Sequence, residues 1–248
     1  MSKTRCEYNY RGIGAQGFYD SSTFETYSLA LPQLVNDDFV GADVVIPASG
    51  SDESGVVWSK KIVGSGPPTV AKTADGVNGF ILCAGTADSE KQDAALHMND
   101  ELMCSIAQGA VFEARLALTV LPTGNGVCSW GLWGAWGDGG STYRVGFEVV
   151  AASGAVYCES DDNATDTAAL SGVTMVAGTY HTFMIDTTVQ ADIKFYIDGA
   201  RVAGSTTFAN AASAANSKCQ PHVGQYKASG TGLGSISVDY VKVWQARS

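Results

Sequence analysis

The chain has 248 residues, of which 45% are hydrophobic and 16% are charged, and its formal net charge is −10. Binding to nucleic acid or to an anionic membrane surface needs a basic face, so we expect neither partner. No stretch reaches the roughly 18 apolar residues of a membrane-spanning helix. The length fits one β-sandwich, and 29 glycines against 6 prolines suit many tight turns between short strands.

Residues 1–36 differ in composition from the rest of the chain. They are rich in Gly, Tyr, Ser and Thr and lack alternation before residues 24–31. We interpret them as an N-terminal arm that leads into one short strand, followed by a sandwich domain over residues 37–248. An arm outside a core either stays disordered or packs on a neighbouring molecule, so its aromatic residues are interface candidates. These are Tyr8, Tyr10, Phe18 and Tyr19.

The start of the chain and its cysteines bear on the compartment. The first five residues are polar and no apolar run follows them, so we expect no secretory leader. The six cysteines are scattered and form no C-x-x-C pair. Because disulfide frameworks are dense in short secreted chains, this distribution favours reduced, mostly buried thiols in a protein made in a cytosol.

From residue 38 onward, short apolar segments alternate with turn residues. Residues 112, 114, 116, 118 and 120 are apolar, and residues 143, 145, 147 and 149 repeat the pattern. A period of two is typical of half-buried strands. Further strands are predicted over residues 56–63, 79–83, 92–98, 127–136, 155–159, 180–186, 193–197, 221–226 and 235–244. The helical candidates are one turn at residues 103–107 and residues 209–215, with a loop as the alternative for the latter. The pattern predicts an all-β, antiparallel two-sheet sandwich of the jelly-roll type.

Three segments in the last third of the chain carry a family resemblance. They read Tyr-His-Thr-Phe-Met-Ile-Asp at residues 180–186, Ile-Lys-Phe-Tyr-Ile-Asp-Gly at 193–199 and Val-Asp-Tyr-Val-Lys-Val-Trp at 238–244. In this order they resemble the C-terminal half of the concanavalin A-like lectin/glucanase superfamily, where the last segment is the closing strand. The resemblance covers residues 110–245 well and residues 38–110 loosely. It implies a concanavalin A-like fold and says little about activity, because strand packing dictates these motifs.

A narrower resemblance lies in residues 90–96, 112–115, 131–136 and 224–232, which look like a group of tailed-phage virion proteins. It implies a capsid decoration protein on the virion exterior, made in the cytoplasm of a bacterial host. Its partners would be the major capsid protein or another virion protein, and further copies of itself, with a trimer as the expected oligomer. Such a protein acts through contact surfaces and needs no cofactor.

The catalytic groups of this superfamily have a characteristic spacing. Its glycosidases carry Glu-x-Asp-x-x-Glu on one strand, where alternation places two carboxylates on one face of a cleft. No such run occurs here, and residues 128–136, where we expect it, contain no carboxylate. Glu113 and Glu148 stand alone on their strands, and we interpret them as solvated or salt-bridged. We therefore predict no hydrolase site.

Lyase and zinc sites also need particular residues at particular spacings. Alginate-lyase-like sandwiches need a Gln-x-His strand and a late tyrosine. Gln225-Tyr226-Lys227 faintly resembles the tyrosine element, and we assign it no Gln-x-His partner, noting only that His222 follows Pro221. The three histidines do not have zinc-ligand spacing. We therefore predict that the protein is not an enzyme and has no catalytic residues.

One acidic loop is a weak candidate for calcium. Glu159, Asp161, Asp162 and Asp166 crowd together with Asn163 and offer hard oxygen ligands. Their spacing is not that of an EF-hand, and acidic turns are common, so a solvated loop is the favoured interpretation. No metal site is assigned on this basis.

Trp130, Trp133 and Trp136 form the main aromatic candidate surface. On an ideal strand Trp130 and Trp136 share one face and Trp133 takes the other, so one face carries a Trp outside the core unless a bulge intervenes or both faces are covered. Burial of all three, a protein interface and stacking on sugar rings are the open interpretations. The leading hypothesis is a structural virion protein. A carbohydrate-binding module, such as one for host attachment, is the alternative, and a glycan hydrolase or lyase is less favoured.

Overall fold

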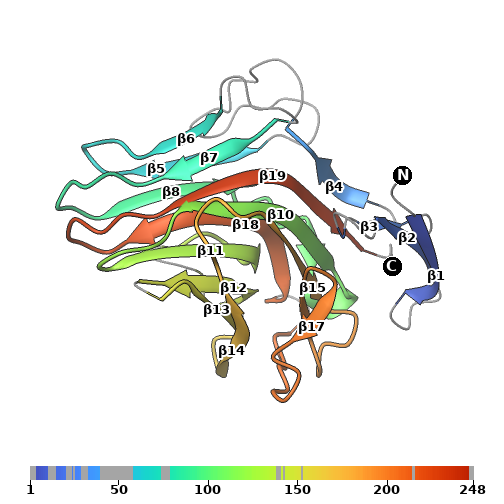
Figure 1. Cartoon of the computed structure of the whole chain (residues 1–248). Coiled ribbons are helices and arrows are strands. Elements are labelled where there is room, and N and C mark those ends of the chain that lie inside the picture. Colours follow the sequence, from blue (N-terminus) through green and yellow to red (C-terminus); the bar gives the residue numbers. More distant parts are fainter. Residues whose placement is uncertain are drawn as a thin grey trace.

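The computed structural model describes residues 4–10, 15–20, 24, 26–28, 33–39, 58–73, 79–137, 141, 143–151, 153–213 and 216–245. These residues form antiparallel sheets, of which two large ones stack as a sandwich (Figure 1). The described part of the chain has one short 3₁₀ helix, η1 (Ile106–Gln108), and within it no helix is long and apolar enough to cross a membrane.

The two large sheets are named here after their central strands. The β10 sheet has the order β17 (Ala200–Val202), β16 (Lys194–Ile197), β15 (His181–Asp186), β10 (Val111–Val120), β19 (Ser235–Trp244), β7 (Ile81–Ala84) and β6 (Thr69–Lys72), and β4 (Gln33–Asp37) also pairs with β19. The β11 sheet has the order β14 (Asp166–Thr174), β13 (Ala155–Asp161), β12 (Arg144–Val150), β11 (Gly126–Trp133), β18 (Lys218–Lys227), β8 (Gln92–His97) and β5 (Ser59–Val63), and β9 (Cys104–Ser105) also pairs with β18. The predicted all-β, antiparallel jelly-roll sandwich is confirmed.

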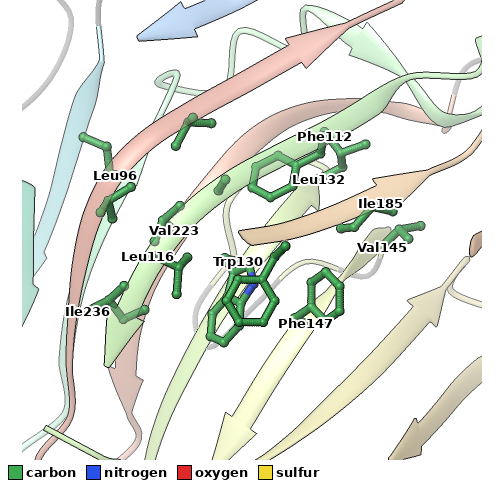
Figure 2. Close-up of a cluster of buried hydrophobic side chains, with 14 of the residues drawn as sticks. Leu96, Phe112, Leu116, Trp130, Leu132, Val145, Phe147, Ile185, Val223 and Ile236 are labelled. Atoms are coloured by element: carbon green, nitrogen blue, oxygen red, sulfur yellow. The ribbon is translucent and has the colours of Figure 1, made fainter. Parts of the chain in front are cut away.

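The core lies between these sheets because alternate residues of each strand point inward. Phe112 and Leu116 of β10 and Phe147 of β12 are fully buried in one continuous cluster (Figure 2). Trp130 of β11 lies at its centre, edge-on to Phe183 with ring centroids 4.7 Å apart. Burial of each such side chain contributes roughly 1.5–3 kcal/mol, so this cluster is the main stabilising feature of the sandwich.

The N-terminal residues form a small antiparallel sheet of β1 (Thr4–Tyr10), β2 (Ala15–Asp20) and β3 (Thr26–Ser28). Two of the interface candidates, Tyr8 and Tyr10, lie on β1, and the other two, Phe18 and Tyr19, lie on β2. Their side chains lie outside the described part of the structure. The expected boundary at residue 36 falls within β4, which pairs with the sandwich strand β19, and the division into arm and domain stays a prediction.

Local expectations differ from the structure in several places. The described part of the Ala-rich segment, residues 209–213, is irregular rather than helical. The expected helical turn at residues 103–107 is the short strand β9 followed by η1. Strand β14 was not predicted at all. Strand β11 ends at Trp133, three residues earlier than expected, and this early end decides where the tryptophans point.

Candidate functional site

A hollow of about 210 Å³ opens on the outer face of the β11 sheet, on the side away from the core. It is lined from β8, β18, β11 and β12, which are adjacent in that sheet, and from the segment after β11. The lining residues are Asp93, Val127, Ser129, Trp133, Trp136, Arg144, Glu148, His222, Gly224, Gln225 and Tyr226.

Strand register explains why these residues meet. Ser129 of β11 pairs directly with Glu148 of β12 on one side and with Gly224 of β18 on the other. Because residues alternate between the two faces of a strand, the neighbours of Ser129 point into the core while Ser129 points outward. Direct pairing of β18 with β8 likewise brings Tyr226 beside Asp93. The floor of the hollow is therefore a row of small and polar side chains between aromatic ones.

Trp133 forms one wall, and two glycines make room for it. Gly131 and Gly146 are direct partners across β11 and β12. A Cβ atom on either one would lie within 2.9 Å of the Trp133 ring, so the indole rests against bare backbone. Its other face stacks on the imidazole of His222, with ring centroids 4.8 Å apart and the planes 23° from parallel. The indole is 4% exposed, so this wall is fixed in place.

His222 is held in its neutral form. Burial, with a further contribution from the nearby His97, lowers the pKa of His222 to about 3. Its Nε2 atom lies 3.4 Å from the Ser129 hydroxyl. A neutral imidazole offers one donor and one acceptor, so His222 adds polarity to the hollow without adding charge.

A carboxyl pair lies beside the floor. Glu148 hydrogen-bonds to Glu159 of β13, and burial, together with the negative charge of Glu159, raises the pKa of Glu148 to about 7. Glu159 also forms an ion pair with Arg144, whose guanidinium lies 3.6 Å from Asp161 and donates to the Ser141 carbonyl at 2.9 Å. Glu148 is the only carboxylate of β12, as expected, and the neighbouring strand β13 places a second carboxylate beside it.

The tryptophans divide between core and hollow. Trp130 is fully buried in the core, and Trp133 takes the opposite face as expected. The expectation that Trp136 shares the face of Trp130 is wrong, because β11 ends at Trp133 and alternation stops there. The backbone N–H of Trp136 donates to Asp100 at 2.7 Å, and the Lys61 ammonium lies 4.1 Å from the centre of its ring. Trp136 is half-buried at the hollow, so it is the tryptophan that a ligand can reach.

The other isolated carboxylate, Glu113, is fully buried rather than solvated. It lies on β10 of the other sheet, and the Tyr240 hydroxyl donates to it at 3.0 Å. Glu113 therefore belongs to a different face of the molecule and takes no part in the hollow.

Sequence reading overlooked one motif. Residue 220 is glutamine, so Gln220-Pro221-His222 does form a Gln-x-His run, and it lies on β18. The Gln220 amide is already used: its oxygen accepts from the backbone N–H groups of Met98 and Asp100, and its nitrogen donates to an Asp100 carboxylate oxygen at 2.8 Å and to the Gly134 carbonyl at 3.2 Å. These bonds occupy Gln220 in joining β18 to the neighbouring loops.

Three of the four acidic loop candidates are engaged with the protein itself. Asp162 accepts from the backbone N–H groups of Ala164, Thr165 and Ala211 at 2.7–3.0 Å. Glu159 and Asp161 face Arg144, whereas Asp166 is exposed at the start of β14, where its backbone pairs with that of Asp161. Across the described ranges, no three His, Cys, Asp or Glu side chains gather in a group that would hold a metal ion.

Comparison with known proteins identifies the fold. No protein-family model and no curated protein matches the chain. Among solved structures, a protein of unknown function from Shewanella oneidensis MR-1 matches with a TM-score of 0.59 at 12% identity over 83% of this chain and 87% of that one. An endo-1,3-beta-glucanase from Streptomyces sioyaensis matches with a TM-score of 0.54 at 18% identity, over 89% of this chain and 98% of that one.

An endo-beta-1,4-glucuronan lyase from Trichoderma reesei matches with a TM-score of 0.53 at 12% identity over 87% of this chain and 96% of that one. At such identities the likeness shows the fold alone, which is a concanavalin A-like sandwich. The structural neighbours are mostly jelly-roll proteins that bind or degrade glycans, and some are toxin binding domains.

Proposed function

We propose that this protein is a non-enzymatic glycan-binding protein and that the hollow on the β11 sheet binds a neutral sugar chain. The observation that carries the proposal is the composition of the hollow. Trp136 and Tyr226, both half-buried, lie beside a row of hydroxyl and carboxyl groups from Ser129 and Glu148, and the buried Trp133 supports this row from one side. Aromatic rings stack on the apolar faces of sugars, and polar groups between them accept and donate hydrogen bonds to the hydroxyls.

The charges around the hollow support a neutral ligand. Arg144 is neutralised by Glu159 and Asp161, and His222 is uncharged. Asp93 adds a further carboxylate to the lining. A uronate or sulfated sugar would bring a negative charge to a site whose described lining residues hold no unpaired cation, although the Lys61 ammonium, outside the lining, lies on the Trp136 ring. Desolvating a charge without a cationic partner is costly.

The carboxyl pair supports binding rather than hydrolysis. Retaining glycosidases hold their two carboxyl groups about 5–5.5 Å apart, and inverting ones hold them farther apart, so that the scissile bond or a water molecule lies between them. Glu148 and Glu159 lie on neighbouring strands, and hydrogen bonding between them contributes to the raised pKa of Glu148. We infer that such a pair serves sugar hydroxyls as hydrogen-bonding groups rather than as a separated nucleophile and acid.

The hydrogen bonds already made by the Gln-x-His run at residues 220–222 argue against a lyase. Elimination next to a uronate carboxylate needs donors or cations that stabilise the developing negative charge. The side-chain amide of Gln220 is hydrogen-bonded to other groups of the protein, and Arg144 is paired with two carboxylates. The groups with the required chemistry are therefore engaged elsewhere.

A glycan array tests the proposal, with neutral laminari- and cello-oligosaccharides set against glucuronan and alginate oligosaccharides. We expect saturable binding to a neutral chain. The Trp136→Ala variant is expected to lose about tenfold in affinity, because an aromatic contact contributes roughly 1.4 kcal/mol. Tyr196→Ala removes a half-buried aromatic from β16 of the other sheet and is the matched control. Binding confined to anionic chains, or equal loss in both variants, contradicts the proposal.

A second candidate function, an exterior virion protein, rests on the phage-like segments. Residues 90–96, 131–136 and 224–232 fall on or next to β8, β11 and β18, which are adjacent strands of the β11 sheet, whereas residues 112–115 lie on β10 of the other sheet. In that setting the sandwich would be anchored to the capsid through residues 1–36 and would present its hollow outward. The trimer and the contact with the major capsid protein belong to this proposal.

Particle analysis tests the virion proposal. We expect the chain to co-purify with phage particles encoded by the same genome, in fixed ratio to the major capsid protein. A chain lacking residues 1–30 is expected to lose attachment. Full attachment by the shortened chain would contradict the role given to the arm, and particles without the protein would contradict the virion role.

A further inference from the structure

One pair of cysteines stands directly opposite in the β11 sheet. Cys104 of β9 pairs with Cys219 of β18, and both side chains point into the core, where they are 3% and 0% exposed. Their Sγ atoms are 3.3 Å apart. Directly opposed residues of antiparallel strands have Cα atoms about 4.5–5.5 Å apart, which lies within the range that a disulfide spans. We propose that Cys104 and Cys219 form a disulfide when the protein enters an oxidising environment.

The geometry requires little movement. A disulfide bond is about 2.05 Å long, so the two sulfurs need to approach by about 1.3 Å. The backbone around them is fixed: the Ile106 N–H donates to the Ser217 carbonyl at 2.9 Å, and the Ser105 and Ser217 hydroxyls are 2.9 Å apart. Side-chain rotation within paired strands therefore accounts for the approach.

Cys104 lies nearer to solvent than Cys219. A second hollow, of about 160 Å³, is lined by Cys104, Lys218 and Gln245 together with their neighbours. Cys219 does not line it. Burial raises the pKa of Cys219 well above its usual value, and the neighbouring Cys104 thiol adds to this effect. Cys104 therefore reacts first and Cys219 second.

The reaction balances with a low-molecular-weight disulfide as the oxidant. The Cys104 thiol loses its proton and attacks one sulfur of the oxidant, forming a mixed disulfide and releasing one thiolate. The Cys219 thiol then loses its proton, attacks the Cys104 sulfur and releases the second thiolate. Two protein thiols are oxidised to one disulfide, and one oxidant disulfide is reduced to two thiols, which take up the two protons.

The bond would add a covalent link to a short strand. Strand β9 has only two residues and, among the described strands, pairs with β18 alone. Ser105 holds it further: its N–H donates to the Gln245 side chain at 2.7 Å, and its carbonyl accepts from the Ala110 N–H at 3.2 Å. The linked residues are 115 positions apart in sequence, so the bond would restrict a long loop of the unfolded chain.

The test uses the folded, full-length protein and oxidised glutathione. Of the six thiols in the chain, two are expected to be lost, so that four remain titratable in denaturant. Peptide mapping is expected to join Cys104 to Cys219, and Tm is expected to rise on the order of 10 °C and return after reduction. Cys158→Ala should keep the link as the matched control, whereas Cys104→Ala should lose it.

Several results would overturn the proposal. They are six intact thiols after oxidation, a stable glutathione adduct on Cys104, or a link formed only after unfolding. A link between Cys83 and Cys128, which lie near each other across the core, would also overturn it. Mapping on the unmodified chain decides the question even where a cysteine variant fails to fold.

Discussion

Replacing Glu148 by glutamine is predicted to change how stability depends on pH. Burial and the charge of Glu159 raise the pKa of Glu148 to about 7, against 4.5 for the free group. Between these values the folded protein keeps a proton that the unfolded chain releases. Because the folded state then binds more protons, the free energy of unfolding falls as the pH rises through this window and levels off above pH 7.

The magnitude follows from the size of the shift. The difference between 7 and 4.5 is 2.5 pKa units, and at about 1.36 kcal/mol per unit this sets a ceiling of about 3 kcal/mol. The side chain is half-buried at an open hollow, so solvent screening reduces the expected loss to about 1–2 kcal/mol. Glutamine stays neutral at every pH and donates to Glu159, so Glu148→Gln should be more stable than the unmodified chain above pH 7 by about this amount.

Two histidines change stability in the opposite direction. Burial lowers the pKa of His222 to about 3 and also lowers the pKa of His97. Below about pH 6.5 the unfolded chain binds protons that these buried groups do not, so stability falls as the pH falls. The unmodified chain and the Glu148→Gln variant both contain these two histidines. The difference between their free energies of unfolding therefore isolates the contribution of Glu148.

Urea unfolding of both proteins between about pH 5 and pH 8 measures this difference. Glu101→Gln, at an exposed position, is the matched control and should give a difference that does not vary with pH. A stability difference for Glu148→Gln that is constant across the range, or that decreases toward pH 8, would refute the reasoning about the carboxyl pair.

Three further variants probe the core and the hollow. Trp130→Ala should lower the free energy of unfolding by roughly 3–5 kcal/mol, since its indole is fully buried, and the measurement is urea unfolding. Gly146→Ala should displace the Trp133 indole, whose ring atoms lie 2.3 Å from the added Cβ, and should weaken glycan binding in titration calorimetry. Gln225→Met should raise Tm, because neither atom of this fully buried amide has a hydrogen-bond partner and methionine removes that cost, about 1–3 kcal/mol. A stable Trp130→Ala, an unaffected Gly146→Ala or a lowered Tm for Gln225→Met would each contradict its premise.

Much of the sandwich follows from the sequence because alternate residues of several central strands are apolar and point into the core. Alternation in β10 and β12 predicts which residues reach the core, and Phe112 and Phe147 are indeed fully buried. Strand β14 has no such signal. It is an edge strand whose residues alternate between exposed and half-buried, and exposed positions such as Leu170, at 56% exposure, need not follow a hydrophobic pattern.

The hollow was less accessible to sequence reasoning, because it depends on register between strands. Glu148 and Glu159 lie eleven positions apart, and nothing in the intervening turn shows that their side chains meet. The position of Trp136 depends on where β11 ends, and strand ends are set by tertiary contacts such as the bond from the Gly134 N–H to the Tyr143 carbonyl at 2.6 Å. The Gln-x-His run was visible in the sequence, but its hydrogen bonds were not.

Binding and turnover measured together on one sample test the central claim most directly. The protein is incubated with the neutral oligosaccharide that binds best on the array, and the sugar is then recovered and weighed by mass spectrometry. The account predicts saturable binding that Trp136→Ala weakens, with every sugar chain recovered at its original mass. Shortened or unsaturated products formed by the unmodified protein, and lost in Glu148→Gln, would contradict it.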